Sequence, residues 1–328
     1  MTLQTRVGTA STSKWPLAMM FVGLVRDGTI GSLDDHASKY VPWWSKDAKD
    51  LKSHITLRHL LSFTSAFGSG IPGQENTTRT CMDNENTTSY IGCAQQLYEG
   101  TNLSGTPGNT YTYNSIHLQL AGAVATYATG LDIQGVIRRY LLEPYGMVNT
   151  SCVLPSAAVP QLAVCLNTTG HDYEQFLLKT LRHDILGRQL VEQTEKDYTP
   201  FLRPYYTLYG LYAFGHFIEC FDAINGFTAA CDDAKIHCDP GAFGFYPLID
   251  RKRGYYMQIV AFEATVLSYP RSGIPEYLRL AIKPLIDDVM GGKDITYTAG
   301  HHTPSQLGLT ISDVNYIAQC YLKPDTCV

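Results

Sequence analysis

The sequence is poor in charged residues and in long apolar runs, and each shortage argues against a class of protein. Lys, Arg, Asp and Glu make up 17% of the 328 residues, against roughly 25% in an average domain. The net charge is −5 and the positive residues are scattered, so nothing indicates a nucleic-acid-binding surface. No apolar run reaches the roughly 18 residues of a membrane span, and no apolar core of a signal peptide precedes residue 11.

Zinc-type cysteine pairs are also missing, although the chain has nine cysteines. Without a C-x-x-C pair a zinc cage is not expected, and we expect neither metal nor cofactor. The spacing instead favours short disulfide loops that pair Cys81 with Cys93, Cys152 with Cys165, Cys231 with Cys238, and Cys320 with Cys327. Cys220 would then have no partner. Spacing does not determine connectivity, and a set of free buried thiols is the alternative.

Five Asn-x-Ser/Thr sequons are interleaved with the cysteines, at Asn76, Asn86, Asn102, Asn149 and Asn167. Sequons together with disulfides are typical of an oxidising, glycosylating compartment. We therefore expect a secreted or extracellular protein that carries N-linked glycans. Because no signal peptide precedes residue 11, this interpretation implies that the chain has lost its true N-terminus.

The hydrophobic period changes along the chain. Apolar spacing and helix-ending residues predict helices over 14–27, 55–61, 115–129, 132–143 and 172–196. Strands are predicted over 205–221. Two further strands are predicted over 243–249 and 255–262, and the polar turn between them is typical of a β-hairpin. A long amphipathic helix follows over 275–290. This order predicts an α+β fold, in which an antiparallel sheet packs beside helices.

Ser11-Thr12-Ser13-Lys14 is the stretch that points most directly to chemistry. Ser11 and Lys14 are three residues apart and share one face of a helix, and the apolar run 15–22 that follows predicts burial. Burial would lower the pKa of the lysine, and a neutral amine can take the proton of a serine. The simpler interpretation is a solvated first turn in which Ser11 is the N-cap.

Further stretches, in matching order and spacing, resemble the serine β-lactamase and penicillin-binding-protein superfamily. The resemblance is greatest to its branch of class C β-lactamases, DD-peptidases and class VIII esterases. It rests on residues 10–14, 24–28, 33–35, 55–65, 107–115, 120–122, 144–151 and 241–247. It implies a β-lactamase/transpeptidase-like fold: an antiparallel sheet flanked by helices plus an all-helical region, with the family's N-terminal strands apparently missing.

The domain implied by this resemblance spans residues 1–290. Its helical region, about 30–200, would be inserted beside a sheet of about 205–265, with the C-terminal helix at about 275–290. Residues 291–328 would form an irregular tail that contains cysteines.

The matched positions take catalytic roles from the resemblance. Ser11 would attack a carbonyl group and form an acyl-enzyme, while Lys14 would hold or accept its proton. Tyr113 falls on the tyrosine of the family's Y-x-N motif, which shares the acid–base work; among 22 tyrosines, an ordinary core aromatic is the alternative. The backbone N–H groups of Ser11 and of the strand near Phe243 would form the oxyanion hole.

Two departures from the family's motifs concern the substrate. Ser115 replaces the asparagine of Y-x-N, and Asp239-Pro240-Gly241 replaces K-T-G or H-x-G. The cation of that last motif normally meets a substrate carboxylate, which Asp239 would repel, and His237 could compensate if the loop bends. The expected substrate-binding residues are Ser115, His237, Asp239, Gly241 and Phe243.

These features predict a secreted serine hydrolase that is esterase-like and acts on a neutral, small-molecule ester or amide. A catalytically silent relative that binds a ligand, or has a structural role, is one alternative. A DD-peptidase or β-lactamase proper is another, and it would need His237 as the missing cation. The oligomeric state is left open by the sequence.

Overall fold

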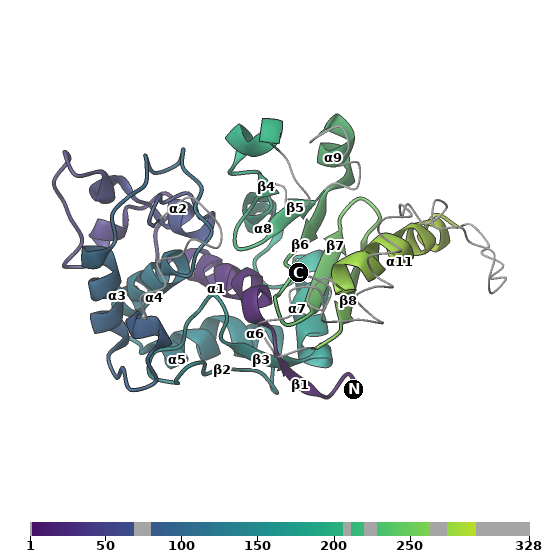
Figure 1. Cartoon of the computed structure of the whole chain (residues 1–328), viewed down its shortest axis with the longest axis horizontal. Helices are drawn as coiled ribbons and strands as arrows, with labels where there is room; N and C mark the ends of the chain where they lie inside the picture. The colour runs from purple at the N-terminus through teal and green to yellow at the C-terminus, as the bar shows by residue number, and fades with distance from the viewer. Residues whose placement is uncertain (1, 69–79, 206–210, 220–227, 263–273, 293–328) are drawn as a thin grey trace, which may run out of the picture.

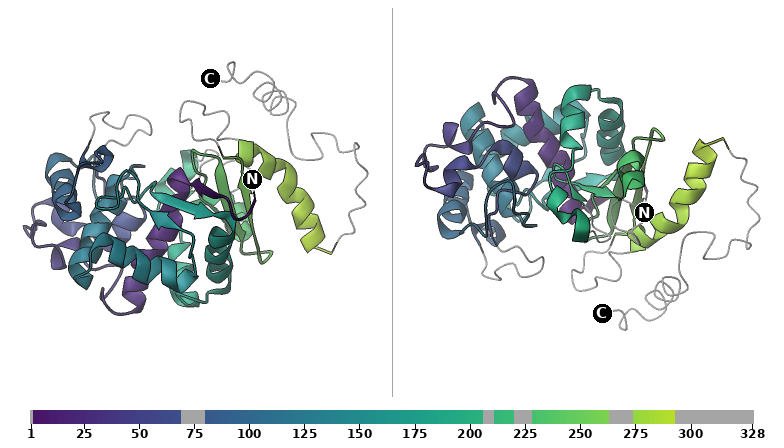
Figure 2. Two further views of the ribbon diagram at one scale, coloured as in Figure 1. Left: turned by 90° about the horizontal axis from the view of Figure 1, so that it is seen from below. Right: turned by 90° about the horizontal axis from the view of Figure 1, so that it is seen from above.

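A computed structural model describes residues 2–68, 80–205, 211–219, 228–262 and 274–292. Helices gather on one side and the main sheet on the other, and α1 (Lys14–Arg26) runs between them (Figure 1). Two further views place α11 (Ile274–Met290) on the side of the sheet away from the helical region (Figure 2). The predicted α+β fold is confirmed.

The main sheet is antiparallel and has the strand order β4-β5-β6-β7-β8. Its strands are β4 (Leu211–Tyr212), β5 (Phe217–Glu219), β6 (Ile236–Cys238), β7 (Phe245–Asp250) and β8 (Tyr255–Val260). β7 and β8 form the predicted hairpin. Its turn includes Gly254 at a φ of 72°, a left-handed value at which glycine is favoured.

A second, three-stranded sheet receives the N-terminal strand. β1 (Arg6–Gly8) pairs with β3 (Leu166–Thr169), and β3 also pairs with β2 (Ser151–Cys152). Both pairings are antiparallel. The segment that leads into Ser11 is therefore anchored in this small sheet and not in the main one.

Most of the helical elements lie where the sequence predicted helices, but no helix was predicted over 90–100, where α3 lies. They are α2 (Leu57–Leu61), α3 (Tyr90–Gly100), α4 (Ile116–Thr129), α5 (Ile133–Ile137), the π turn η5 (Arg138–Leu142), α6 (Glu143–Tyr145), α7 (Gly170–Arg182), α8 (Arg188–Thr194) and α9 (Ala229–Ala234). The 3-10 turns are η1 (Ala10–Ser13), η2 (Ala37–Lys39), η3 (Leu51–His54), η4 (Cys81–Asp83) and η6 (Pro200–Tyr205).

Two helix predictions need correction. The helix expected over 132–143 continues through α6, because Pro144 lies in that helix's first turn, where a missing N–H costs nothing. The helix expected over 172–196 is interrupted between α7 and α8, where His183 and Gly187 have φ values of 63° and 72°. Such left-handed residues end a helix.

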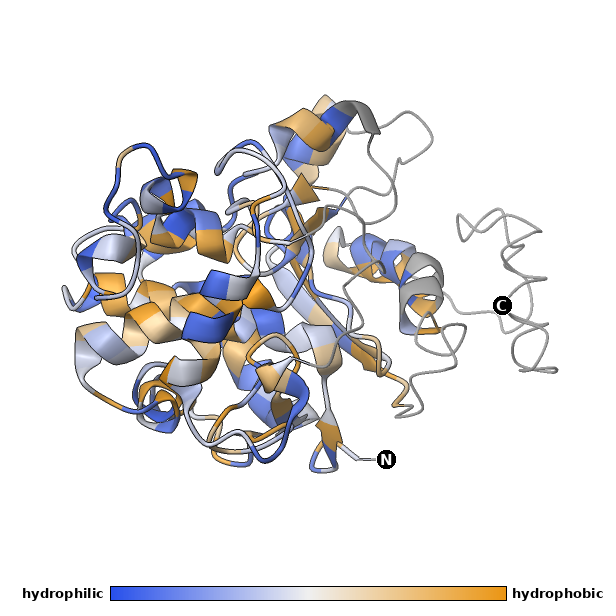
Figure 3. Cartoon of the chain, turned by 60° about the vertical axis from the view of Figure 1, so that its left-hand side comes forward, coloured by the Kyte–Doolittle hydropathy of each residue, from blue (hydrophilic) through white to orange (hydrophobic). Residues whose placement is uncertain are grey.

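α1 is the centre of the hydrophobic core. Every residue from Lys14 to Leu24 is buried, as expected for a helix that is apolar on all sides and lies between two layers. α11 is different, because hydrophobic and hydrophilic residues alternate along it (Figure 3). Its buried Arg279 and Lys283 form ion pairs with Glu219 of β5 and Asp250 of β7.

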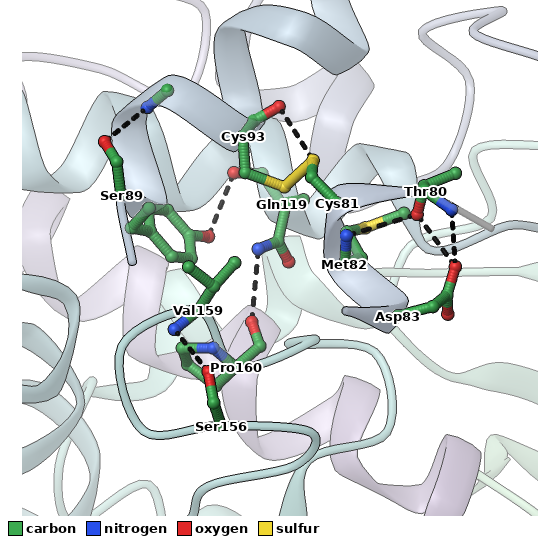
Figure 4. Close-up of a disulfide and its surroundings, with 12 residues drawn as sticks. Thr80, Cys81, Met82, Asp83, Ser89, Cys93, Gln119, Ser156, Val159 and Pro160 are labelled. Carbon is green, nitrogen blue, oxygen red and sulfur yellow. Dashed lines mark hydrogen bonds between the residues drawn. A yellow bond between two sulfur atoms is a disulfide. The ribbon is translucent and has the colours of Figure 1, made fainter. Parts of the chain in front are cut away.

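Two of the expected disulfides are confirmed and one is wrong. Cys81 is bonded to Cys93, which joins η4 to α3 (Figure 4), and Cys152 is bonded to Cys165. Cys238 is a free, buried thiol, whereas Cys231 is disulfide-bonded. Cys231 lies on α9 and Cys238 ends β6, and an extended strand rises about 3.3 Å per residue, so β6 carries Cys238 away from α9.

Several other predictions concern the remaining parts of the chain. Asn76, Cys220, Cys320, Cys327 and nearly all of the expected tail lie outside the described residues. Asn86, Asn102 and Asn149 are exposed, and Asn167 is half-buried on β3. None of the helices in the described ranges is long and apolar enough to cross a membrane.

Gly241 packs closely against the turn that carries Ser11. A Cβ atom at Gly241 would lie 2.1 Å from the carbonyl oxygen of Thr9 and 2.4 Å from Oγ1 of Thr12. We predict that Gly241→Ala lowers the free energy of unfolding by about 1–3 kcal/mol or more, as measured by urea denaturation. Gly100→Ala is the control, since nothing lies within 4 Å of its Cβ position. Equal stability of the two variants would contradict the prediction.

Candidate active site

Ser11 lies in the short turn η1, between β1 and α1. Ala10, just before it, has a φ of 49°, a left-handed conformation that is strained for a residue with a Cβ atom. Thr12 Oγ1 donates to the carbonyl oxygens of Asp239 (2.8 Å) and Phe245 (2.9 Å). Ser13 Oγ accepts a hydrogen bond of 3.0 Å from the N–H of Leu166 in β3. The turn is thus fixed to both sheets.

The capping interpretation of Ser11 is wrong. Ser13 is the N-cap residue of α1 and Thr9 that of η1, and neither makes a capping side-chain bond. Ser11 instead remains half-buried, and its hydroxyl oxygen accepts a hydrogen bond of 2.9 Å from the amine of Lys14.

Lys14 brings three separate segments together. Its side chain is buried, and Nζ donates to Ser11 Oγ at 2.9 Å and to the carbonyl oxygen of Ala163 at 3.1 Å. Nζ also lies 4.8 Å from the ring centroid of Tyr113, close enough for a cation–π contact. The structure therefore brings Ser11, Lys14 and Tyr113 together, and Ala163 joins them through a backbone atom.

A hydrogen-bonded loop holds Tyr113 in place. On its N-terminal side, Thr112 donates from its N–H to Phe63 O (3.0 Å) and from Oγ1 to Phe67 O (2.8 Å). On its C-terminal side, Asn114 Nδ2 donates to the same Phe67 oxygen at 2.8 Å. Both neighbours of Tyr113 are buried, so the backbone has little freedom at this position.

Aromatic contacts position the Tyr113 ring. It stacks on Phe217 of β5, with 5.8 Å between centroids and 28° between planes, and meets Tyr212 of β4 edge-on at 5.9 Å. Such pairs contribute roughly 0.5–1.5 kcal/mol beyond area burial. The main sheet therefore forms the wall against which Tyr113 rests.

Ser115 has a partner that sequence reasoning missed. Its hydroxyl oxygen accepts a hydrogen bond of 3.2 Å from Nε2 of Gln161. Gln161 and Ala163 both belong to the loop that the Cys152–Cys165 disulfide closes. The two cysteines were the one sequence signal that marked this loop.

Gly241 and Phe243 lie beside residues 8–12, in the turn before β7 and not in the strand that the resemblance implied. The Phe243 ring is half-buried and lies next to β1, since a Cβ atom on Gly8 would be 3.3 Å from it. The N–H of Phe243 makes no hydrogen bond with any described residue. It is a free donor on the segment that the resemblance assigns to the oxyanion hole.

Asp239 lies behind the Ser11 turn, with its carboxyl group hydrogen-bonded to α1. It is fully buried, and its Oδ2 accepts a hydrogen bond of 3.1 Å from the N–H of Trp15 in the first turn of α1. Burial raises the pKa of the Asp239 carboxyl well above its usual range, against the opposing effect of Lys14. The neutral acid is therefore favoured over the repelling anion that the sequence suggested.

His237 does not replace the missing cation. It is buried in β6, where its Nδ1 lies 3.1 Å from Nε2 of His216. Burial and then Arg251 lower the pKa of His237 to about 3, and burial lowers that of His216 to about 3 as well. Both rings are neutral at physiological pH, although Glu195 Oε2 lies 3.8 Å from His237 Nε2.

The arrangement can support nucleophilic chemistry at Ser11. A half-buried hydroxyl, a buried amine in contact with it and a phenol beside the amine are the groups that an acyl-transfer site needs. Within the described ranges, no three His, Cys, Asp or Glu side chains are grouped so that they could hold a metal ion.

Comparisons with known proteins agree with this geometry. A family model described as Beta-lactamase matches residues 1–216. No curated protein matches the chain. Among solved structures, the chain is similar to EstCE1, a hydrolase with promiscuous acyltransferase activity, with 16% identity, a TM-score of 0.66, and coverage of 83% of this chain and 84% of that one.

Two further structures show the same fold. The beta-lactamase/D-alanine carboxypeptidase of Yersinia pestis has 17% identity and a TM-score of 0.59, over 84% of this chain and 83% of that chain. A penicillin binding protein of Bacillus halodurans also has 17% identity and a TM-score of 0.59, over 87% of each chain. At these identities the likeness shows the fold alone.

The buried histidine pair makes stability depend on pH. Below the ordinary histidine pKa of about 6.5, histidines of the unfolded chain bind protons. In the folded protein His216 and His237 do not bind them until about pH 3. We predict that the free energy of unfolding falls as the pH drops from 6.5 towards 3, by at most about 1.4 kcal/mol per pH unit for each histidine. Urea denaturation at a series of pH values measures this slope.

The His237→Gln variant should show a shallower slope than the parent, because it removes the contribution of His237 and leaves those of His216, His59 and His117, whose pKa values burial also lowers. His54→Gln is the matched control for the loss of a histidine, since that ring is exposed. The same slope in the parent and in His237→Gln would contradict the prediction.

Proposed function

The chain belongs to the beta-lactamase family, and on that premise we propose that it is a serine hydrolase that forms an acyl-enzyme on Ser11. The superfamily contains esterases and DD-peptidases. The observation that carries the proposal is the 2.9 Å contact between Lys14 Nζ and Ser11 Oγ. It joins a nucleophile to a base inside a site where Lys14 is only 2% exposed.

The proposed reaction has two halves. Ser11 Oγ attacks the substrate carbonyl carbon while its proton passes to the pair formed by the Lys14 amine and the Tyr113 phenol, and the leaving alcohol or amine takes that proton as its bond to the acyl group breaks. Water then attacks the acyl-enzyme by the reverse route and releases the acid. The N–H groups of Ser11 and Phe243 stabilise the oxyanion in both halves.

A neutral ester or amide is the substrate that we propose. Asp239 stands at the aligned position of the family's cation, and burial favours its uncharged form. His237, the possible replacement, is neutral because burial lowers its pKa to about 3. A substrate carboxylate would therefore gain no partner from either residue, which disfavours a DD-peptidase or β-lactamase. The hydrolase with promiscuous acyltransferase activity among the similar structures supports an acyl-transfer role.

We propose further that the protein is secreted and glycosylated. Two disulfides and the exposed sequon residues Asn86, Asn102 and Asn149 support this. Peptide-N-glycosidase treatment of the protein made in a secreting eukaryotic cell should lower its mass. An unchanged mass would contradict glycosylation.

Ser11→Ala is the direct test of the nucleophile. We predict that this variant loses all covalent labelling by a fluorophosphonate probe and all hydrolysis of phenyl esters, because it lacks the hydroxyl that forms the acyl bond. Ser104→Ala, which removes the hydroxyl of an exposed serine, should keep both activities. An unlabelled parent protein would favour the silent binding role, and a labelled Ser11→Ala variant would exclude the proposed mechanism.

Tyr113→Phe separates acid–base work from packing. The substitution keeps the ring beneath Lys14 and its stacking on Phe217, but removes the phenol. We predict a fall in kcat of about 10²–10⁴-fold with an unchanged melting temperature. Tyr111→Phe makes the same change two residues away and should keep kcat within about 3-fold; an equal loss in both variants would argue for a structural role.

A further inference from the structure

Ser115 departs from the family's Y-x-N motif, because serine stands where the motif has a carboxamide. An asparagine offers a substrate amide both a donor and an acceptor, whereas a serine side chain is shorter and carries one hydroxyl. In the structure a carboxamide reaches this place from a different segment. Gln161 Nε2 donates to Ser115 Oγ at 3.2 Å.

Gln161 retains hydrogen-bonding capacity after that contact. A carboxamide has two N–H donors and one oxygen acceptor, and the bond to Ser115 uses one donor. No described residue bonds to Oε1 or takes the second N–H. The side chain is half-buried, and its oxygen is not among the enclosed atoms without a partner. One N–H and Oε1 are therefore not used by the described residues, and Oε1 is not enclosed.

The position of Gln161 relative to the reacting groups follows from two short chain segments. Gln161 is two residues before Ala163, whose carbonyl accepts from Lys14 Nζ at 3.1 Å. Ser115 is two residues after Tyr113, whose ring centroid is 4.8 Å from the same Nζ. The Gln161–Ser115 bond thus bridges the two segments that meet at Lys14, beside Ser11.

The loop that carries Gln161 is held firmly. Gln119, buried in α4, donates from Nε2 to Pro160 O at 3.1 Å and accepts from the N–H of Leu162 at 3.3 Å (Figure 4 shows the first of these bonds). Both chain neighbours of Gln161 are therefore fixed by one side chain. The N–H of Gln161 itself donates to Leu154 O at 2.8 Å. A recognition group on such a rigid support needs little ordering when it binds.

We propose that Gln161 is a specificity residue for the acyl side of the substrate. Its free N–H and Oε1 bind the C=O and N–H of a secondary amide close to the scissile carbonyl, and Ser115 orients the carboxamide. The preferred substrates are then esters or amides of N-acylated amino acids. This inference rests on the proposed acyl-enzyme chemistry at Ser11.

Two esters of equal length test the proposal: phenyl N-acetylglycinate, which carries a secondary amide, and phenyl pentanoate, which does not. The parent should prefer the first. Gln161→Leu should lower kcat/KM for the acetylglycinate roughly 10-fold, since one good hydrogen-bonding group is worth about that factor. The same variant should keep kcat/KM for the pentanoate, and the rate of fluorophosphonate labelling of Ser11, within about 2-fold.

A rescue variant and a control complete the design. Adding Ser115→Asn to Gln161→Leu should restore most of the preference for the acetylglycinate, because it returns a carboxamide to the Y-x-N position. Gln95→Leu removes another half-buried glutamine, on α3, and should change nothing. Equal losses with both esters, or no loss with either, would overturn the specificity role. A parent that is neither labelled nor active would overturn the proposed function itself.

Discussion

The structure depends on the burial of one amine, Lys14 Nζ. α1 is apolar on all sides and is enclosed between the helical region and the main sheet, so any polar group on it must find partners inside the protein. Lys14 finds them in Ser11, in the carbonyl of Ala163 and in the Tyr113 ring. These groups come from the first turn, from the disulfide-closed loop and from the loop before α4. The contacts that bury Lys14 in the core are therefore the same contacts that assemble the site.

The same dependence explains which parts of the molecule the sequence predicted well. The helix after Ser11, the hairpin around Gly254 and the short disulfides are local, and periodicity, turn chemistry or spacing indicates each of them. Ser11 and Lys14 are also local, because three residues place them on one helical face. Tyr113 came from a family motif rather than from any local pattern. What these residues share is that short-range geometry or a motif carries the information.

The missed features depend on contacts between distant segments. Ala163 acts through a backbone oxygen, which has no residue signature, and Gln161 reaches Ser115 across 46 positions of sequence. His237 was named as a cation that could compensate for Asp239 if the loop bends, because the two residues are close in the chain. Its role is decided instead by strand β6, which buries the ring against His216. The Cys231–Cys238 pairing failed for a related reason, since spacing says nothing about the direction of the intervening strand.

The electrostatics of Asp239 follow from two opposing effects. The N-terminus of a helix favours a negative group, and Trp15 donates its N–H to this carboxyl. Complete burial penalises the anion, and burial is the larger effect on the pKa. Burial therefore favours the uncharged form of Asp239 at the position where the family's motif has a cation. Without that cation, and with no anion in its place, neither sign of charge on a substrate gains a partner at this position. Recognition must then depend on hydrogen bonds such as those that Gln161 can form.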